Sequence, residues 1–267
     1  MPAYAAVSRQ THAGKAWRRH EGYGFAAAEM IVPLVGAEFA KAAVAMPIAF
    51  VGEPGAFRPV ALLSLLPGRN LFVGPDGKWL GGYVPAALRG HPFALLRPEG
   101  ADQSVLCVAE DTGLVVDAGA PGAEPFFDAD GAPAPPVKPV LDFLVQLDAN
   151  RIATGRAVAA LAAAEALAPW PLEVETADGR KAVAGLFRVD EARLNALEPD
   201  AFLALRAAGA LPLAYAQLLS MAQLSVFQTL AQLQQQLAQI HAQQRQTIEQ
   251  SFVAAPTETL SFTWDNL

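Results

Sequence analysis

The chain has little cysteine and little histidine, and these two shortages exclude several kinds of site. Its 267 residues include a single cysteine, Cys107, so no intrachain disulfide is possible. Cys107 lies in the apolar run 105–108, which predicts a buried strand residue and not a redox or catalytic thiol. Four histidines are present, and none lies at a spacing typical of metal ligands. We therefore expect no metal site and no cofactor.

Charge is also sparse, and its sign argues against nucleic acid. Charged residues make up 17% of the chain and the net charge is -7, whereas nucleic-acid binding requires a basic surface that displaces phosphate counterions. The only locally basic segment, 15–20, contains Trp17 between its cations and is predicted to be a solvated turn. No nucleic-acid partner is expected.

Long uncharged apolar runs are absent, although 53% of the residues are hydrophobic and the mean hydropathy is +0.26. The best candidate, 25–51, is interrupted by Glu29, Glu38 and Lys41 and falls short of the roughly 18 residues that a spanning helix needs. No membrane span is therefore expected. The first residues lack a basic region followed by an apolar core, which predicts a cytoplasmic protein.

The stretch 70–93 combines turn-forming residues with several aromatics. Asp76-Gly77 lies between two apolar runs, a pattern typical of a hairpin because glycine accepts the positive φ of a tight turn. Phe72 and Trp79 flank this turn and are both expected to be buried. The stretch is predicted to be structural and shows no signature of a catalytic loop.

The order of patterns predicts an α+β protein with two regions. Short, closely spaced strand patterns indicate a mostly antiparallel β region at 1–131. Four prolines in 132–139 predict a linker. Residues 140–267 read as mainly helical, with a β-hairpin at 172–189 and one long helix at about 211–250.

The predicted long helix carries a row of apolar residues at alternating spacings of four and three, which we call the apolar seam. The seam consists of Val226, Leu230, Leu233, Leu237 and Ile240. It is too short for an independent coiled coil and must be covered. The chain's own helical half, the alternating apolar residues of 260–264, or a second copy are the alternatives, and the glutamine-rich flanks favour a homodimer.

Motifs spread along the chain resemble one known family. They are Phe25-Ala26, Val32-Pro33-Leu34, Glu38-Phe39, Pro47-Ile48-Ala49-Phe50, Asn70-Leu71-Phe72-Val73, Asp76-Gly77-Lys78-Trp79, Tyr83-Val84-Pro85, Leu88-Arg89, Pro92-Phe93, Phe126-Phe127, Asp130-Gly131, Asp142-Phe143-Leu144 and Gly185-Leu186-Phe187-Arg188-Val189-Asp190. Over residues 10–230 this order resembles the SapC family of bacterial proteins, named after a member of a surface-layer gene locus. The resemblance implies a link to surface-layer or envelope functions and brings no established activity. Gly90-His91 replaces the Arg-Tyr pair expected before Pro92-Phe93, which removes one cation.

Two functions follow from these observations. The leading hypothesis is a non-enzymatic accessory or binding protein whose partner is an envelope or surface-layer component, or the machinery that handles one. The alternative is an enzyme, or a partner subunit of one, with a site near Arg89, His91, Glu38 and Asp76, since a histidine beside an arginine and a carboxylate supports acid–base chemistry. The candidate binding residues are these four together with Trp79 and Tyr83.

Overall fold

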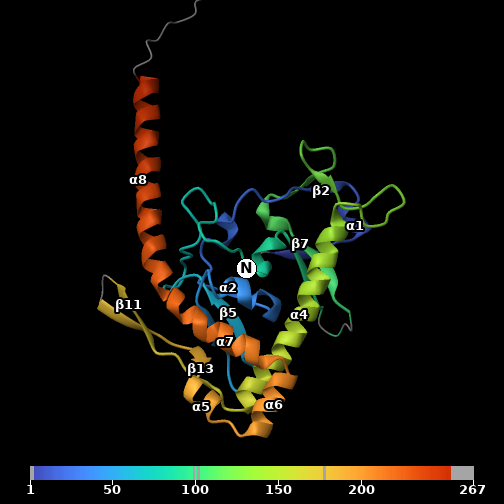
Figure 1. The fold of residues 1–267 in the computed structure, drawn as a ribbon. Coiled ribbons are helices and arrows are strands. Elements are labelled where there is room, and N and C mark those ends of the chain that lie inside the picture. Colours follow the sequence, from blue (N-terminus) through green and yellow to red (C-terminus); the bar gives the residue numbers. More distant parts are fainter. Residues whose placement is uncertain (1–2, 99, 101–102, 177–178, 254–267) are drawn as a thin grey trace, which may run out of the picture.

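The computed structural model describes residues 3–98, 100, 103–176 and 179–253, and these form an α+β fold, as predicted (Figure 1). Antiparallel sheets come mainly from the first half of the chain, and helices dominate the second half. Two separate hydrophobic cores define two parts, which we call the large lobe and the small lobe.

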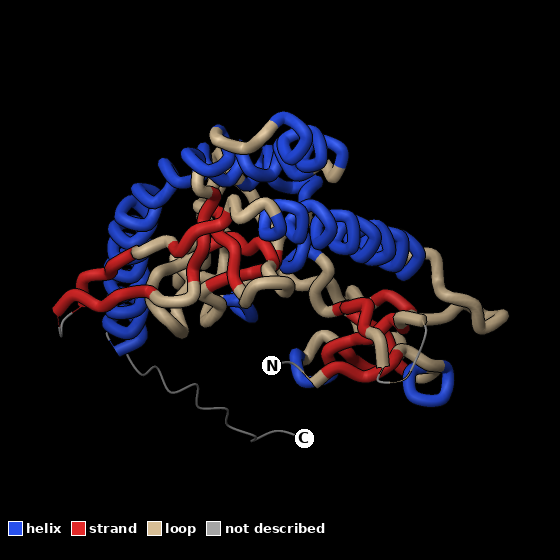
Figure 2. Tube along the Cα trace, turned by 90° about the horizontal axis from the view of Figure 1, so that it is seen from below, coloured by secondary structure: helices blue, strands red, loops and turns tan. Residues whose placement is uncertain are grey.

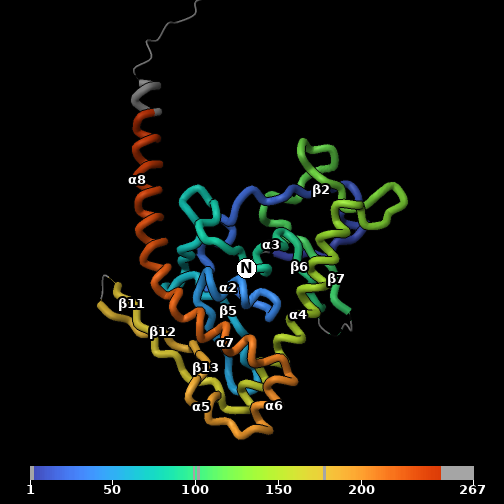
Figure 3. The backbone as a smooth tube through the Cα atoms, in the orientation of Figure 1, coloured from blue at the N-terminus to red at the C-terminus, as the bar shows by residue number. Residues whose placement is uncertain are grey.

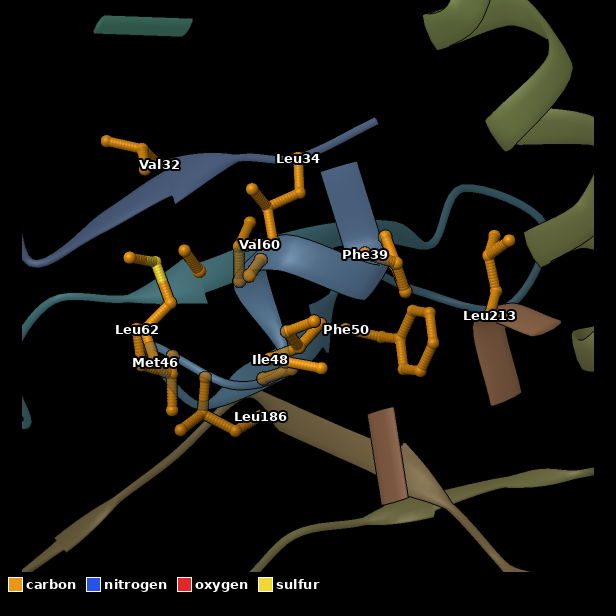
Figure 4. Packing of buried hydrophobic residues seen from close by; sticks show 14 of the residues in the cluster. Val32, Leu34, Phe39, Met46, Ile48, Phe50, Val60, Leu62, Leu186 and Leu213 are labelled. Atoms are coloured by element: carbon orange, nitrogen blue, oxygen red, sulfur yellow. The ribbon is translucent and has the colours of Figure 1, made fainter. Parts of the chain in front are cut away.

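The large lobe is built on a five-stranded antiparallel sheet with the order β10-β13-β4-β5-β3. Its central strands are apolar on both faces: Val60, Ala61 and Leu62, within the nearly continuous apolar run 59–66, are all buried. Phe39, Met46 and other large side chains pack around them (Figure 4). The strands are β3 Ile31–Pro33, β4 Ile48–Val51, β5 Arg58–Leu62, β10 Leu167–Pro169 and β13 Leu186–Val189.

The small lobe contains two three-stranded sheets, ordered β1-β7-β6 and β8-β2-β9. Trp17, Phe93, Val108 and Phe126 form its core. Cys107 on β7 is buried, as predicted, and burial raises the pKa of its thiol. The strands are β1 Tyr4–Ala6, β2 Lys15–Trp17, β6 Phe93–Leu96, β7 Val105–Ala109, β8 Val115–Asp117 and β9 Glu124–Pro125.

One helix, α4 (Val137–Ala163), connects the two cores. Its first turns place Val137 and Leu144 in the small core, and its later turns place Val158 and Leu161 in the large core. Figure 2 shows α4 running from the smaller group of strands towards the larger one. The sequence suggested a linker at 132–139, whereas α4 already begins within that segment.

Short helices and 3-10 turns connect the strands, and a cluster of helices follows α4. In the first half they are α1 Arg9–His12, η1 Gly24–Ala26, η2 Gly36–Glu38, α2 Phe39–Ala42, α3 Ala86–Arg89 and η3 Glu110–Thr112. In the second half they are α5 Glu191–Asn195, α6 Pro199–Ala207, α7 Ala210–Ser220, η4 Met221–Ser225 and α8 Val226–Val253. The single long helix predicted at 211–250 is thus divided by the 3-10 turn η4.

Both predicted Asp-Gly hairpins differ in extent from the structure. At Asp76-Gly77 the turn forms with Gly77 at φ 79°, but one isolated bridge, Val73 to Trp79, replaces the two flanking strands. The second hairpin pairs only β11 (Leu172–Thr176) with β12 (Gly179–Val183). The rest of the range 172–189 is β13, which leaves the hairpin and joins the large sheet.

The apolar seam is partly covered by the large lobe itself. Leu230 is 4% exposed and belongs to the large core, and Val226 packs against that core. Ile240, further along α8, is 47% exposed. Figure 3 shows α8 extending away from the body of the protein. Association through the seam stays a prediction, and the predicted apolar tail at 260–264 lies outside the described residues.

Contrary to the expectation that 25–51 is the best candidate, the stretch from Ala210 to Thr247 is the one among the described residues that is long and apolar enough, by length and composition alone, to cross a membrane. Of the most apolar part of this stretch, 33% is buried inside the protein. Helix α7, which begins the stretch, contributes Leu213 and Ala214 to the large core.

Helix α7 is also joined to the sheet by a buried glutamine. The side-chain carbonyl of Gln217 accepts a hydrogen bond from the Val189 amide at 2.9 Å, and its amide donates to the Ile48 carbonyl at 3.1 Å. Val189 and Ile48 lie on the neighbouring strands β13 and β4, just beyond their last paired residues. Gln217 therefore supplies, from a helix, the hydrogen bonds that the strands would otherwise make to each other.

Replacing Gln217 with leucine should destabilise the fold strongly. Gln217→Leu keeps the volume but leaves the Val189 amide and the Ile48 carbonyl buried without partners, at a cost of about 2–4 kcal/mol in the free energy of unfolding. Urea denaturation measures this loss. Gln228→Leu, at an exposed position of α8, is the matched control and should change the stability by less than about 0.5 kcal/mol. Similar stabilities of the two variants would contradict the role of Gln217.

Candidate functional site

A cleft of about 380 Å³ lies where three segments of the chain meet. Residues 17–20 follow strand β2, residues 89–93 connect α3 to β6, and residues 136–143 contain the first turns of α4. Figure 3 shows α3 and β6 beside α4, and α4 packs directly on β6. The cleft therefore depends on the small lobe, on the helix that both lobes share, and on α3, whose Leu88 belongs to the large core.

Arg89, at the end of α3, is the most distinctive residue of the cleft. Its guanidinium carbon lies 5.2 Å from the centroid of the Phe143 ring and 5.9 Å from that of the Tyr83 ring, both cation–π distances. One of its nitrogens approaches the Tyr83 hydroxyl at 3.5 Å. No ion pair among the described residues involves Arg89, so its charge faces the cleft without a carboxylate partner.

A second arginine lines the cleft, but its charge is shared. The Arg19 guanidinium lies 5.5 Å from the ring centroid of Trp17, which is 2% exposed. Arg19 also pairs with Glu124 at 3.4 Å. Of the two guanidinium groups that line the cleft, that of Arg89 is thus the one without a carboxylate among the described residues to balance its charge.

Two histidines complete the polar wall and are neutral near pH 7. The ring of His91 stacks on Phe25 with centroids 3.7 Å apart, and the His20 ring lies 5.8 Å from it. Burial, together with the neighbouring His20, lowers the pKa of His91 to about 4. Burial also lowers the pKa of His20, whose Nδ1 donates to the Gly22 carbonyl at 3.0 Å.

Glu38, a predicted site residue, faces the interior and does not line the cleft. It is 4% exposed, and its carboxylate accepts hydrogen bonds from the Val35 amide at 3.1 Å, the Tyr83 hydroxyl at 2.8 Å and the Ala86 amide at 2.6 Å. Burial and the hydrogen bond to Glu38 raise the pKa of Tyr83 to about 12. Glu38 therefore fixes the start of α3 and so positions Arg89.

Asp76 and Trp79 belong to the turn and not to the cleft. Asp76 accepts a hydrogen bond from the Lys78 amide and pairs with the Lys78 ammonium at 3.3 Å; the amide hydrogen bond is the main cause of its lowered pKa. The Trp79 indole N–H donates to the Tyr83 carbonyl at 2.8 Å, and its ring stacks on the buried Phe72. Of the six predicted site residues, the cleft therefore contains Arg89 and His91.

Three further residues line the cleft that were not predicted from the sequence: Arg19, His20 and Phe143. The available signal was the basic segment 15–20, which we expected to be a solvated turn. The first half of that segment is strand β2, which buries Trp17 and places the following residues at the edge of the cleft. Among the described residues, no three histidine, cysteine or acidic side chains gather as metal ligands would.

The SapC family model matches residues 7–227. The chain belongs to the SapC family. The match includes all three segments that line the cleft, so the cleft lies within the SapC region, whereas most of α8 follows it. Neither the curated proteins nor the solved structures contain a match to the chain.

Glu38→Gln should destabilise this SapC protein. Glutamine offers one acceptor oxygen in place of two, and its amide group would face a backbone N–H, so at least one buried donor loses its partner at a cost of about 2 kcal/mol. Chemical denaturation measures the change. Glu29→Gln, at an exposed position, is the control and should leave the stability unchanged. Equal midpoints for the two variants would show that the Glu38 carboxylate does not hold α3.

His91 should make the protein less stable in acid. The unfolded chain binds a proton at the ordinary histidine pKa of 6.5, whereas folded His91 does so only near pH 4, so stability falls as the pH drops from 6.5 to 4. Because the ring is partly exposed, we expect a loss of about 1 kcal/mol at pH 5 relative to pH 7. His91→Phe keeps the stacking on Phe25 and removes the titration, so its melting temperature should fall less between pH 7 and pH 5. An identical fall in both proteins would contradict the assignment.

Proposed function

We propose that this SapC protein is a non-enzymatic binding protein and that the cleft beside Arg89 is its ligand site. The observation that carries this proposal is the unpaired guanidinium of Arg89 in an acidic chain of net charge -7. Such a guanidinium, in contact with two aromatic rings and without a carboxylate partner in the described part of the chain, is a typical recognition group. A ligand anion that binds it does not have to compete with a carboxylate of the protein.

The chemistry of the cleft supports binding over catalysis. The described residues that line it include arginines, histidines and aromatics but no carboxylate. The alternative hypothesis combines His91 and Arg89 with Glu38 or Asp76, yet Glu38 is turned towards Ala86 and Tyr83, and Asp76 pairs with Lys78. His91 also has a pKa of about 4, which is low for a general base at neutral pH.

The family supports an envelope or surface-layer component, or the machinery that handles one, as the partner. SapC proteins take their name from a member of a surface-layer gene locus, and this link is the basis for the proposed partner. A cytoplasmic location, as the sequence predicts, is compatible with binding such a component before its export. A homodimer through the apolar seam is a separate prediction and does not bear on the cleft.

Arg89→Gln should abolish capture of the partner. The full-length protein, immobilised, is incubated with detergent-solubilised envelope and with cytosol of the source bacterium, and mass spectrometry quantifies the retained components. Loss of a desolvated charged contact should reduce retention at least about tenfold. Arg156→Gln, an exposed arginine of α4 that does not line the cleft, is the matched control and should retain as much as the wild type. Equal retention by both variants would overturn the assignment of the cleft.

A further inference from the structure

The donors of Arg89 indicate what kind of group the cleft binds. A guanidinium has five N–H donors in its plane, and ring stacking uses none of them. Arg89 makes one long hydrogen bond, 3.5 Å to the Tyr83 hydroxyl, and its other donors have no acceptor among the described residues. The hydroxyl is itself held by Glu38 at 2.8 Å, so this contact also fixes where the guanidinium lies.

Among its described residues, the cleft has one uncompensated positive charge, which a ligand with a single negative charge would balance. The Arg19 guanidinium is already paired with Glu124, and His20 and His91 are neutral near pH 7 because their pKa values are lowered. Arg89 is thus the one uncompensated cation among the described lining residues. A carboxylate balances it, whereas a phosphate dianion brings a second charge that no cation of the cleft compensates.

The side of the cleft formed by α4 is apolar. Val140 and Phe143 lie on one face of the first α4 turns and are half-buried, and Pro139 beside them is exposed. With a volume of about 380 Å³, the cleft is in the range of small-ligand sites and accommodates one ring and a short chain. Aliphatic and aromatic side chains beside a cation favour a ligand with an apolar body and one anionic end.

We propose that the cleft binds a carboxylate attached to an apolar ring, with the carboxylate on the Arg89 donors and the ring against Phe143 and Val140. This inference rests on the proposed binding function and gives its site a ligand class. Two sources carry such a group: a small aromatic acid, and a protein chain that ends in an aromatic residue with its terminal carboxylate free.

The test compares matched probes on the full-length wild-type protein by NMR titration at neutral pH. 4-Phenylbutyrate should bind at least about tenfold more tightly than 4-phenylbutanamide, which has the same shape without the charge. Phenyl phosphate, a dianion at this pH, should bind more weakly than the carboxylate. A tetrapeptide ending in phenylalanine, with a free or an amidated terminus, separates the two sources: the free form binds more tightly than 4-phenylbutyrate if the natural ligand is a chain terminus.

Variants locate the binding. Arg89→Gln should remove the preference for the acid over the amide, Phe143→Ala should weaken both probes, and Arg156→Gln should behave as the wild type. Equal binding of acid and amide by the wild-type protein, a measurement that needs no variant, overturns the proposed ligand class. If envelope components are nevertheless retained in an Arg89-dependent way, the binding function stands and only the ligand class is wrong.

Discussion

The buried carboxylate of Glu38 is the constraint on which the site depends. It belongs to the 3-10 turn before α2, and it accepts hydrogen bonds from Val35 beside it and from Tyr83 and Ala86 far along the chain. A buried carboxylate is tolerated only when its oxygens are satisfied, and here three donors do so. The same contacts fix both ends of the short segment that leads to Arg89. A residue that resembles a catalytic acid in the sequence therefore acts as an internal support.

Local signals in the sequence predicted much of the fold correctly. The α+β class, the buried strand around Cys107, the apolar central strands and the turn at Gly77 each follow from patterns within a few residues. Contacts between segments far apart in the sequence are not predicted by such local patterns. The prolines at 132–139 suggested a linker, but proline is also favoured in the first turn of a helix, and α4 begins there. Likewise, no pattern around Val189 indicates that β13 pairs with β4, which lies about half the chain length away in the sequence.

The candidate site was predictable only in part for the same reason. Arg89 and His91 lie two positions apart, beside a family motif, so a search for polar residues found them. Glu38 appeared equivalent to them because sequence does not reveal which way a side chain faces. Arg19 and Phe143 come from segments on either side, and they reach the cleft only because strand β2 and helix α4 pack on the same small core.

The contact between Gln217 and Ile48 has a consequence for how the chain acquires its structure. The two residues are 169 positions apart, and β4 lacks its β13 neighbour until the chain beyond it has also been made. Pairing over such distances is slow, because the chain must close a long loop before the contact contributes stability. During synthesis, strand β4 therefore presents an open, apolar edge of the kind that pairs with other chains. Because of this sheet order, the nascent chain needs protection from aggregation until the helices near its end are in place.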